Sequence, residues 1–339
     1  MKNITVLGID LAKDVFQVHG VDKKGKKVVS KRLSKTKLVE FMAKLTPCLV
    51  GMEACGSAHY WARQFEKMGH KVKLMAPQFV KPYVKSNKND FNDAEAIAEA
   101  VTRPSMRFVP KKNVEQQSIQ SIHRSRDLLV GQRTALCNHI RGLLLEFGIT
   151  LAKGVSQISK KVLLIIEDAE NELTPDVREL MKDHVEFLGE NNKKIEKLTK
   201  KINQIAEKDE RCQRLMEVEG IGPMTATAVV ASVGNATEFK NGREMAAWIG
   251  LVPRQSSSGN KKVLLGISKR GDRYLRRLLI HGGRAVVKTC ADKEDKRHLW
   301  VKSKKDKMGV NKAAVAVANK NARIIWALLA KNEHYKKAS

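Results

Sequence analysis

The stretch Ile4-Thr5-Val6-Leu7-Gly8-Ile9-Asp10-Leu11-Ala12-Lys13 places a carboxylate directly after an apolar run rich in β-branched residues. Such a run predicts a buried strand over residues 4–9. A carboxylate at the end of an apolar strand is costly to bury unless it is paired or bound to a metal. Asp10 is therefore the first candidate site residue, and an ordinary turn residue is the alternative interpretation.

Strand and helix signals alternate over the next seventy residues. Strands predicted over 15–21 and 27–33, joined by a turn, complete an antiparallel meander with the first strand. The pattern then predicts a helix over 36–45, a strand over 48–52, a helix over 58–68 and a strand over 71–75. This order is that of a ribonuclease-H-like α/β domain, although many α/β folds share a mixed sheet with helices on its faces.

The remainder of the chain is predicted to be mostly helical, over residues 92–103, 114–147, 156–208, 224–233, 239–248 and 310–330. Heptad spacing within 156–208 relates the apolar residues Leu188, Ile195, Leu198, Ile202 and Ile205. This seam fits a dimerising coiled coil and one side of an intrachain hairpin equally well. We expect a catalytic α/β domain over 1–150, a helical coiled-coil linker over 156–208 and a mostly α-helical C-terminal domain over 209–339.

Three further carboxylates join Asp10 as candidate metal ligands. Glu53 closes the short apolar strand, so that it meets Asp10 at one sheet edge if the two strands are neighbours. Asp90 and Asp93 are three residues apart, on one face at the start of a helix, although each taken singly is typical of a helix cap. Oxygen ligands select hard cations such as Mg²⁺ or Mn²⁺. The set therefore indicates metal-assisted phosphodiester chemistry.

The net charge of +28 over 339 residues indicates a polyanionic partner. Lys and Arg are spread along the whole chain, which favours nucleic acid over a membrane surface. A protein that was basic only for solubility would need a much smaller net charge.

The cysteines and the apolar segments indicate a cytoplasmic protein without a membrane partner. The cysteines are odd in number and form no CxxC pair, which argues for reduced thiols rather than disulfides or a zinc site. No apolar run approaches the roughly 20 residues that span a bilayer.

Two C-terminal segments are candidate nucleic-acid contacts. The motif Glu219-Gly220-Ile221-Gly222-Pro223 before an apolar helix is similar to a helix-hairpin-helix, in which Gly220 and Gly222 let backbone N–H groups approach a phosphate. An ordinary connection between two helices is the alternative. Residues 250–261 are predicted to be a flexible phosphate-binding loop. The cations of this loop and the basic segment after it are Arg254, Lys261, Lys262, Lys269 and Arg270.

The sequence as a whole resembles the DEDD transposases of bacterial insertion sequences, which are related to the Piv site-specific invertases. The resemblance covers almost the whole chain. It rests on the motifs at residues 8–13, 52–54, 88–94, 219–223, 250–259 and 266–271.

This resemblance implies a RuvC-like N-terminal domain in which Asp10, Glu53, Asp90 and Asp93 form the metal-binding tetrad. It also implies a C-terminal serine that attacks DNA and forms a transient phosphoserine link. Ser258 fits the family motif best, Ser257 comes next, and Ser256 completes the triple serine.

The resemblance further implies a structured guide RNA, encoded by the element, that bridges donor and target DNA. Because the helical linker separates the acids from the serine, the serine can come from another subunit. We therefore expect a homo-oligomer, either a dimer or a tetramer.

Two other functions fit part of the sequence. A junction resolvase or nuclease that uses metal-activated water would keep the acids and form no protein–DNA adduct. A non-catalytic nucleic-acid-binding protein would bind equally well without Mg²⁺ and after loss of Asp90 and Asp93.

Overall fold

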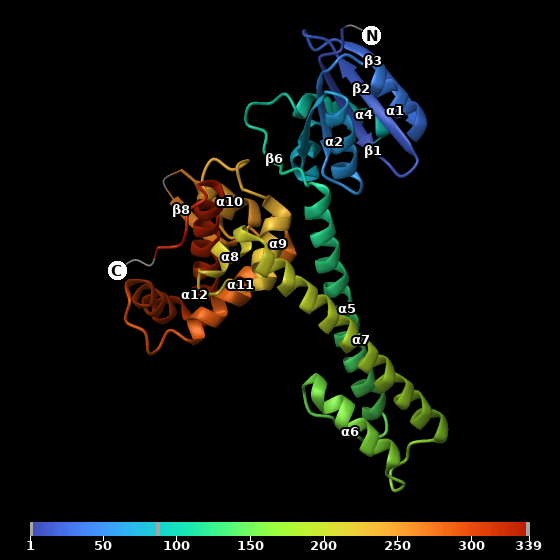
Figure 1. Cartoon of the computed structure of the whole chain (residues 1–339), viewed down its shortest axis with the longest axis vertical. Coiled ribbons are helices and arrows are strands. Elements are labelled where there is room, and N and C mark those ends of the chain that lie inside the picture. The colour runs from blue at the N-terminus through green and yellow to red at the C-terminus, as the bar shows by residue number, and fades with distance from the viewer. Residues whose placement is uncertain (1–2, 86–88, 260, 337–339) are drawn as a thin grey trace. The chain divides into compact units, whose positions relative to one another are not determined.

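A computed structural model describes residues 3–85, 89–259 and 261–336, without the side chains of Lys261 and Lys262 (Figure 1). It divides into two compact units. Unit 1 comprises Met1–Glu115 with Ala236–Lys240, and unit 2 comprises Gln116–Asn235 with Asn241–Ser339. The three-part division expected from the sequence stays a prediction.

Unit 1 is built on a six-stranded sheet with the strand order β3-β2-β1-β4-β5-β6. The strands are β1 (Val6–Leu11), β2 (Val15–Val21), β3 (Lys27–Ser34), β4 (Leu49–Glu53), β5 (Lys71–Met75) and β6 (Phe108–Val109). The first three strands form the predicted antiparallel meander, β4 runs parallel to β1, and β5 runs parallel to β4. The short strand β6, which the sequence pattern does not predict, pairs antiparallel to β5. The mixed sheet confirms the ribonuclease-H-like fold.

The helices of unit 1 are α1 (Lys35–Lys44), α2 (Ala58–Lys67), α3 (Pro77–Val80), the 3₁₀ helix η1 (Lys81–Tyr83) and α4 (Asp90–Ala100). Alternate residues of each strand face opposite sides of the sheet. Leu7 and Ile9 of β1 enter an apolar core that also contains residues of α1 and α2. The residue between them, Gly8, faces α4, and a Cβ there would lie only 2.2 Å from the Ala94 carbonyl oxygen. Glycine thus lets α4 lie directly on β1.

The helical middle of the chain folds back on itself. Helix α5 (Val114–Leu145) is followed by α6 (Val155–Glu167) and α7 (Pro175–Lys208), so the predicted helix over 156–208 is two helices. The break has a local cause, because Thr174 caps α7 and Pro175 occupies its first turn, where proline is favoured. The apolar seam of α7 lies within the chain. Asn191 donates to the Leu129 carbonyl oxygen at 3.2 Å, and Arg126 donates to the Thr199 hydroxyl at 2.8 Å. Of the two alternatives for the seam, the structure has the intrachain hairpin.

The C-terminal part is helical, as predicted, with one exception. Its helices are α8 (Glu210–Met216), α9 (Pro223–Val233), α10 (Gly242–Ile249), α11 (Arg273–Lys288) and α12 (Lys296–Ala330), the last interrupted at Gly309. The prediction of a loop over 250–261 is wrong, because β7 (Pro253–Ser258) pairs antiparallel with β8 (Lys261–Ile267). The apolar run Val263-Leu264-Leu265 supplies the partner strand, and Gly259 adopts the positive φ of 54° at the turn.

Throughout the described ranges, every helix is too short or too polar to cross a membrane.

Candidate functional site

Asp10 and Glu53 occupy neighbouring positions on adjacent parallel strands. The β1–β4 register runs from Val6 opposite Leu49 to Ile9 opposite Met52, so Asp10 and Glu53 come next on each strand. Residues two apart share a face, which places both carboxylates on the face that Gly8 and Gly51 turn toward α4. Burial and the charges of Glu53 and Asp10 raise the pKa of the nearby Cys55 thiol. The structure therefore brings these two half-buried acids to one end of the sheet.

Asp90 and Asp93 lie in the first turn of α4. Asn89, rather than either aspartate, caps the helix, since its side-chain oxygen accepts a hydrogen bond from the Asn92 backbone N–H at 2.8 Å. Asp90 is exposed and Asp93 is half-buried. Ala94, the next residue, lies against Gly8. The two aspartates thus begin the helix that covers the face bearing Asp10 and Glu53.

The chemistry of these four side chains fits a hard divalent cation, because all are carboxylates. Among the residues that the structure describes, however, no three His, Cys, Asp or Glu side chains are grouped so that they could hold a metal ion. The structure brings Asp10 and Glu53 together but does not bring all four carboxylates into one cluster. The assignment of all four acids as metal ligands stays a prediction.

An open groove of about 480 Å³ begins where the two acid-bearing strands end. The segments that follow Asp10 and Glu53 line it, together with Lys35 and two aromatic residues of α2. Lys13 and Lys35 are exposed, and the Tyr60 ring packs edge-on against Trp61 with centroids 5.2 Å apart. Cationic and aromatic side chains are the combination that binds single nucleic-acid strands.

The three serines lie on an exposed strand, β7. Because side chains alternate along a strand, Ser256 and Ser258 share one face, and Ser257 shares the other with Gln255. Gln255 Nε2 donates to Ser257 Oγ at 2.8 Å. Ser258 immediately precedes Gly259, at the end of the hairpin. Its assignment as the nucleophile stays a prediction.

The base of the hairpin is fixed to the body of unit 2. A Cβ on Gly250 would lie 2.0 Å from the Arg270 carbonyl oxygen, so only glycine allows this approach. Arg276 donates to the carbonyl oxygens of Ile249 at 2.9 Å and Arg270 at 3.2 Å. Of the predicted cations of this segment, Arg254, Lys269 and Arg270 are exposed. The side chains of Lys261 and Lys262 lie outside the described residues.

The glycine-rich turn over 219–223 joins α8 to α9, and its two glycines differ. Gly220 has a φ of 86°, and a Cβ there would lie 2.8 Å from the Gly282 carbonyl oxygen of α11. Gly222 is exposed at the start of α9, where a Cβ would meet nothing within 4 Å. Packing against α11 therefore explains why residue 220 is a glycine. Of the two glycines, Gly222 is the one that leaves room for a phosphate.

Glu219 ties the same turn to α12. Its carboxylate accepts from Lys293 Nζ at 2.8 Å and lies 2.7 Å from His298 Nε2. Its backbone oxygen accepts hydrogen bonds from Arg297 and Asn321. Burial opposes ionisation of this carboxyl, but Lys293 and His298 hold its pKa below the ordinary value.

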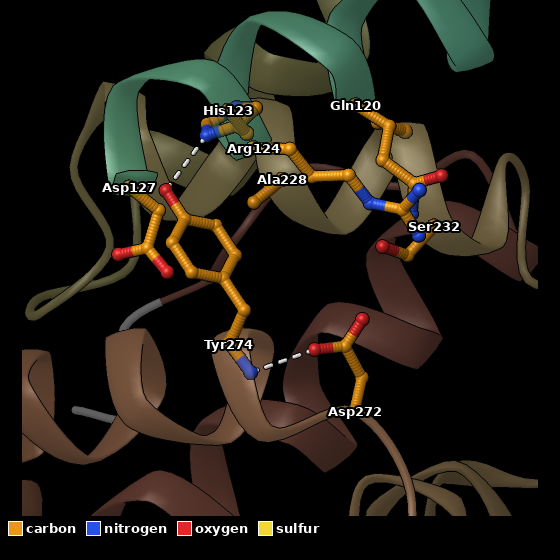
Figure 2. A pocket seen from close by; sticks show the side chains of 9 residues that line it. Gln120, His123, Arg124, Asp127, Ala228, Ser232, Asp272 and Tyr274 are labelled. Atoms are coloured by element: carbon orange, nitrogen blue, oxygen red, sulfur yellow. Dashed lines mark hydrogen bonds between the residues drawn. The ribbon is translucent and has the colours of Figure 1, made fainter. Parts of the chain in front are cut away.

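A polar pocket of about 170 Å³ lies between α5, α9 and the start of α11 (Figure 2). The buried His123 bridges two hydroxyl groups, with Nδ1 2.9 Å from Tyr274 Oη and Nε2 2.9 Å from Thr227 Oγ1. Burial lowers the pKa of His123 to about 4 and raises that of Tyr274 to about 12. Thr227 donates to the Pro223 carbonyl oxygen at 2.7 Å. It therefore accepts from His123, which places the imidazole proton on Nε2 and makes Nδ1 the acceptor for Tyr274.

Sequence patterns could not reveal this pocket, because its partners lie far apart in the chain. His123 is 151 residues from Tyr274 and 104 from Thr227. Each residue taken alone belongs to an unremarkable helical segment.

Comparison with known proteins agrees with both halves of the fold. Residues 7–149 match the sequence family DEDD_Tnp_IS110, described as a transposase. Residues 212–299 match the one described as the transposase IS116/IS110/IS902 family.

Similar proteins align over nearly their full lengths. A probable family 20 transposase of Pseudomonas aeruginosa is 51% identical over 98% of this chain and 99% of its own length. The transposase for insertion sequence element IS1111A of Coxiella burnetii is 48% identical over 99% of this chain and 92% of its own length. The transposase for insertion sequence element IS1328 of Yersinia enterocolitica is 41% identical over 96% of this chain and 97% of its own length. The chain therefore belongs to the IS110/IS1111 family of insertion-sequence transposases, DNA-binding enzymes of transposition with a DEDD-type N-terminal domain.

Proposed function

We propose that this transposase cuts and rejoins DNA by metal-assisted phosphoryl transfer, with Ser258 as the nucleophile. The observation that carries the proposal is the pair of carboxylates, Asp10 and Glu53, on adjacent strand ends of a DEDD-type domain. The groove beside them, with Lys13, Lys35 and Tyr60, offers a path for the strand that is cut.

Mg²⁺ is the proposed ion, with Mn²⁺ as a substitute, since DEDD-type transposase domains use divalent metals in general. Bound there, the ion would neutralise charge on the scissile phosphate. Asp10 and Glu53 would hold it from the sheet. Asp90 and Asp93 would complete the site from the start of α4.

The serine step exchanges one phosphate ester for another. The Ser258 oxygen forms a bond to phosphorus while the bond from phosphorus to one deoxyribose oxygen breaks. The proton lost by the serine hydroxyl balances the proton gained by the leaving oxygen. Rejoining reverses these events with the hydroxyl end of a second strand, so the energy of the phosphodiester bond is conserved.

The acids and the serine belong to different compact units. We therefore propose a homo-oligomer, a dimer or a tetramer, in which one subunit can supply the serine to the acids of another. A structured guide RNA is proposed as a second nucleic-acid partner, which the net charge of +28 supports. The proposed contacts are Gly222, Arg254, Lys261, Lys262, Lys269 and Arg270; Gly220, predicted alongside Gly222, packs against α11 instead.

Substitution of Asp10 by Asn tests the metal site. Loss of a group that stabilises transition-state charge costs roughly 100-fold or more in rate, so strand cleavage should fall by that factor while DNA binding persists. Asp14→Asn, the same change at an exposed residue four positions away, should retain cleavage. Chelation of divalent ions should reproduce the Asp10→Asn result in the unchanged protein. Normal recombination by Asp10→Asn would refute the metal-site assignment.

Trapping of covalent protein–DNA adducts tests the serine. Ser258→Ala should remove the adduct, and Ser257→Ala is the matched control because Ser257 points to the other face of β7. If cleavage proceeds in the unchanged protein without any adduct, the metal-activated-water alternative is favoured. If binding is unaffected by Mg²⁺ and no cleavage occurs, the non-catalytic alternative is favoured.

Sequencing of the nucleic acid that co-purifies with the chain tests the guide RNA. A discrete short RNA encoded beside the gene is expected. Recombination of purified protein and DNA without RNA would contradict this part of the proposal.

A further inference from the structure

A second cavity in unit 2, of about 490 Å³, lies between the start of α10 and the second half of α12. Arg243 of α10 and Lys320 and Arg323 of α12 line it. The remaining lining residues are Asn241, Gly242, Ile324, Trp326 and Ala327. Three side chains of the lining are thus cationic and none is acidic.

The first turn of α10 is fixed in place beside these cations. A Cβ on Gly242 would lie 2.8 Å from the Arg323 carbonyl oxygen, so the two backbones meet as closely as glycine permits. Asn241 caps α10 by accepting from the backbone N–H groups of Arg243 and Glu244, both at 3.0 Å.

Lys320 shows that positive charge accumulates here. Its Nζ lies over the Trp300 ring at 4.3 Å from the centroid, and the side chain is half-buried. Burial and the charges of Arg297 and Arg323 together lower the pKa of this ammonium group. Lys320 and Arg323 are three residues apart, so they share one face of α12. Repulsion among them is relieved if an anion binds between them.

We propose that this cavity binds a phosphate of a nucleic-acid backbone, with Arg243, Lys320 and Arg323 as its contacts. Arginine suits this ligand because its planar fork of N–H donors matches the oxygens of a phosphate. The proposal extends the nucleic-acid surface beyond Arg254, Lys269 and Arg270. It rests on the DNA binding of the transposase family and is independent of the acid and serine mechanism.

The salt dependence of binding tests the site. Each cation–phosphate contact contributes about 0.9 to the slope of log K against log salt for duplex DNA, and about 0.7 for a single strand. The variant Arg243→Gln/Lys320→Met/Arg323→Gln should lower that slope by about 2.7 for duplex DNA, or about 2.1 for single-stranded RNA. Measurement with both probes identifies which backbone the cavity holds, and a fall with either one supports the site.

A control variant with three substitutions removes the same amount of positive charge elsewhere in the chain. Arg103, Lys111 and Lys200 are each already paired with a glutamate, so Arg103→Gln/Lys111→Met/Lys200→Met should change the slope much less. Equal changes in the two triples, or no change in either, would overturn the proposal. If the triple variant of the cavity fails to fold, the single substitution Arg323→Gln, at an exposed position, replaces it. It should lower the slope for duplex DNA by about 0.9, and Arg103→Gln is its control.

Discussion

The buried imidazole of His123 makes the stability of unit 2 depend on pH in a way that can be calculated. Its pKa is about 4 in the folded chain, against the ordinary value of 6.5 for a histidine side chain. The unfolded chain therefore binds the proton more readily, and the unfolding free energy falls as pH drops below 6.5. Each pKa unit corresponds to about 1.4 kcal/mol. The loss from this one residue should reach about 2 kcal/mol at pH 5 and about 3 kcal/mol at pH 4. Above pH 7 it should be negligible.

The substitution His123→Gln isolates this effect from the other groups that titrate over the same range. Glutamine can donate to Thr227 and accept from Tyr274, yet it takes up no proton. Urea unfolding can be followed by tryptophan fluorescence, because Trp248, Trp300 and Trp326 lie in unit 2.

Between pH 7.5 and 5, the unchanged protein should lose about 2 kcal/mol more than the His123→Gln variant. His281→Gln, at an exposed position, should follow the unchanged protein more closely. Parallel curves for the unchanged protein and His123→Gln would refute the assignment of a neutral, buried imidazole.

Three further predictions concern packing and order. Gly250→Ala should destabilise unit 2 by more than about 2 kcal/mol in urea unfolding, because its φ is 82° and the new Cβ would strike Arg270; Gly222→Ala, with open space around it, should cost about 1 kcal/mol or less. Ile195→Ala should cost about 2–5 kcal/mol, and the cost should not vary with protein concentration, since the seam packs within the chain; a concentration-dependent cost would restore the dimerising coiled coil. Hydrogen exchange of the β7 and β8 amides should slow when DNA binds, because the hairpin is exposed along all of β7; unchanged exchange rates would contradict a role in DNA contact.

The sheet and the acid pair could be predicted from sequence because their determinants are local. Alternating apolar runs indicate the strands, and a carboxylate at the end of each of two such runs reaches the same sheet end once the strands are parallel neighbours. The capping role of Asn89 could not be separated from Asp90 and Asp93 in this way. Asn and Asp both cap helices, and only the hydrogen bond identifies which of the three residues does so here.

The hairpin that carries the three serines could not be predicted from the local sequence, for a different reason. Ser, Gly and Asn disfavour strands when taken alone. The segment becomes a strand because a basic and apolar run lies opposite it, with Ser256 paired to Val263. The cation cavity and the His123 pocket could not be predicted from local sequence at all, because each is formed by helices from distant parts of the chain.

The two halves of the proposed active site are held by different physical means, and this difference bears on how the enzyme is controlled. Asp10 and Glu53 lie at the ends of two paired strands whose central residues are buried, and close packing of Gly8 against α4 fixes the sheet from one side. Ser258 lies on a two-stranded hairpin that is exposed along β7 and anchored at its base through Gly250 and Arg276. An isolated two-stranded hairpin is only marginally stable. The position of the acids is therefore set by the fold, whereas that of the serine depends on what the hairpin contacts. If Ser258 is the nucleophile, as proposed, nucleic acid bound to unit 2 would then order it, and cleavage would require an assembled complex.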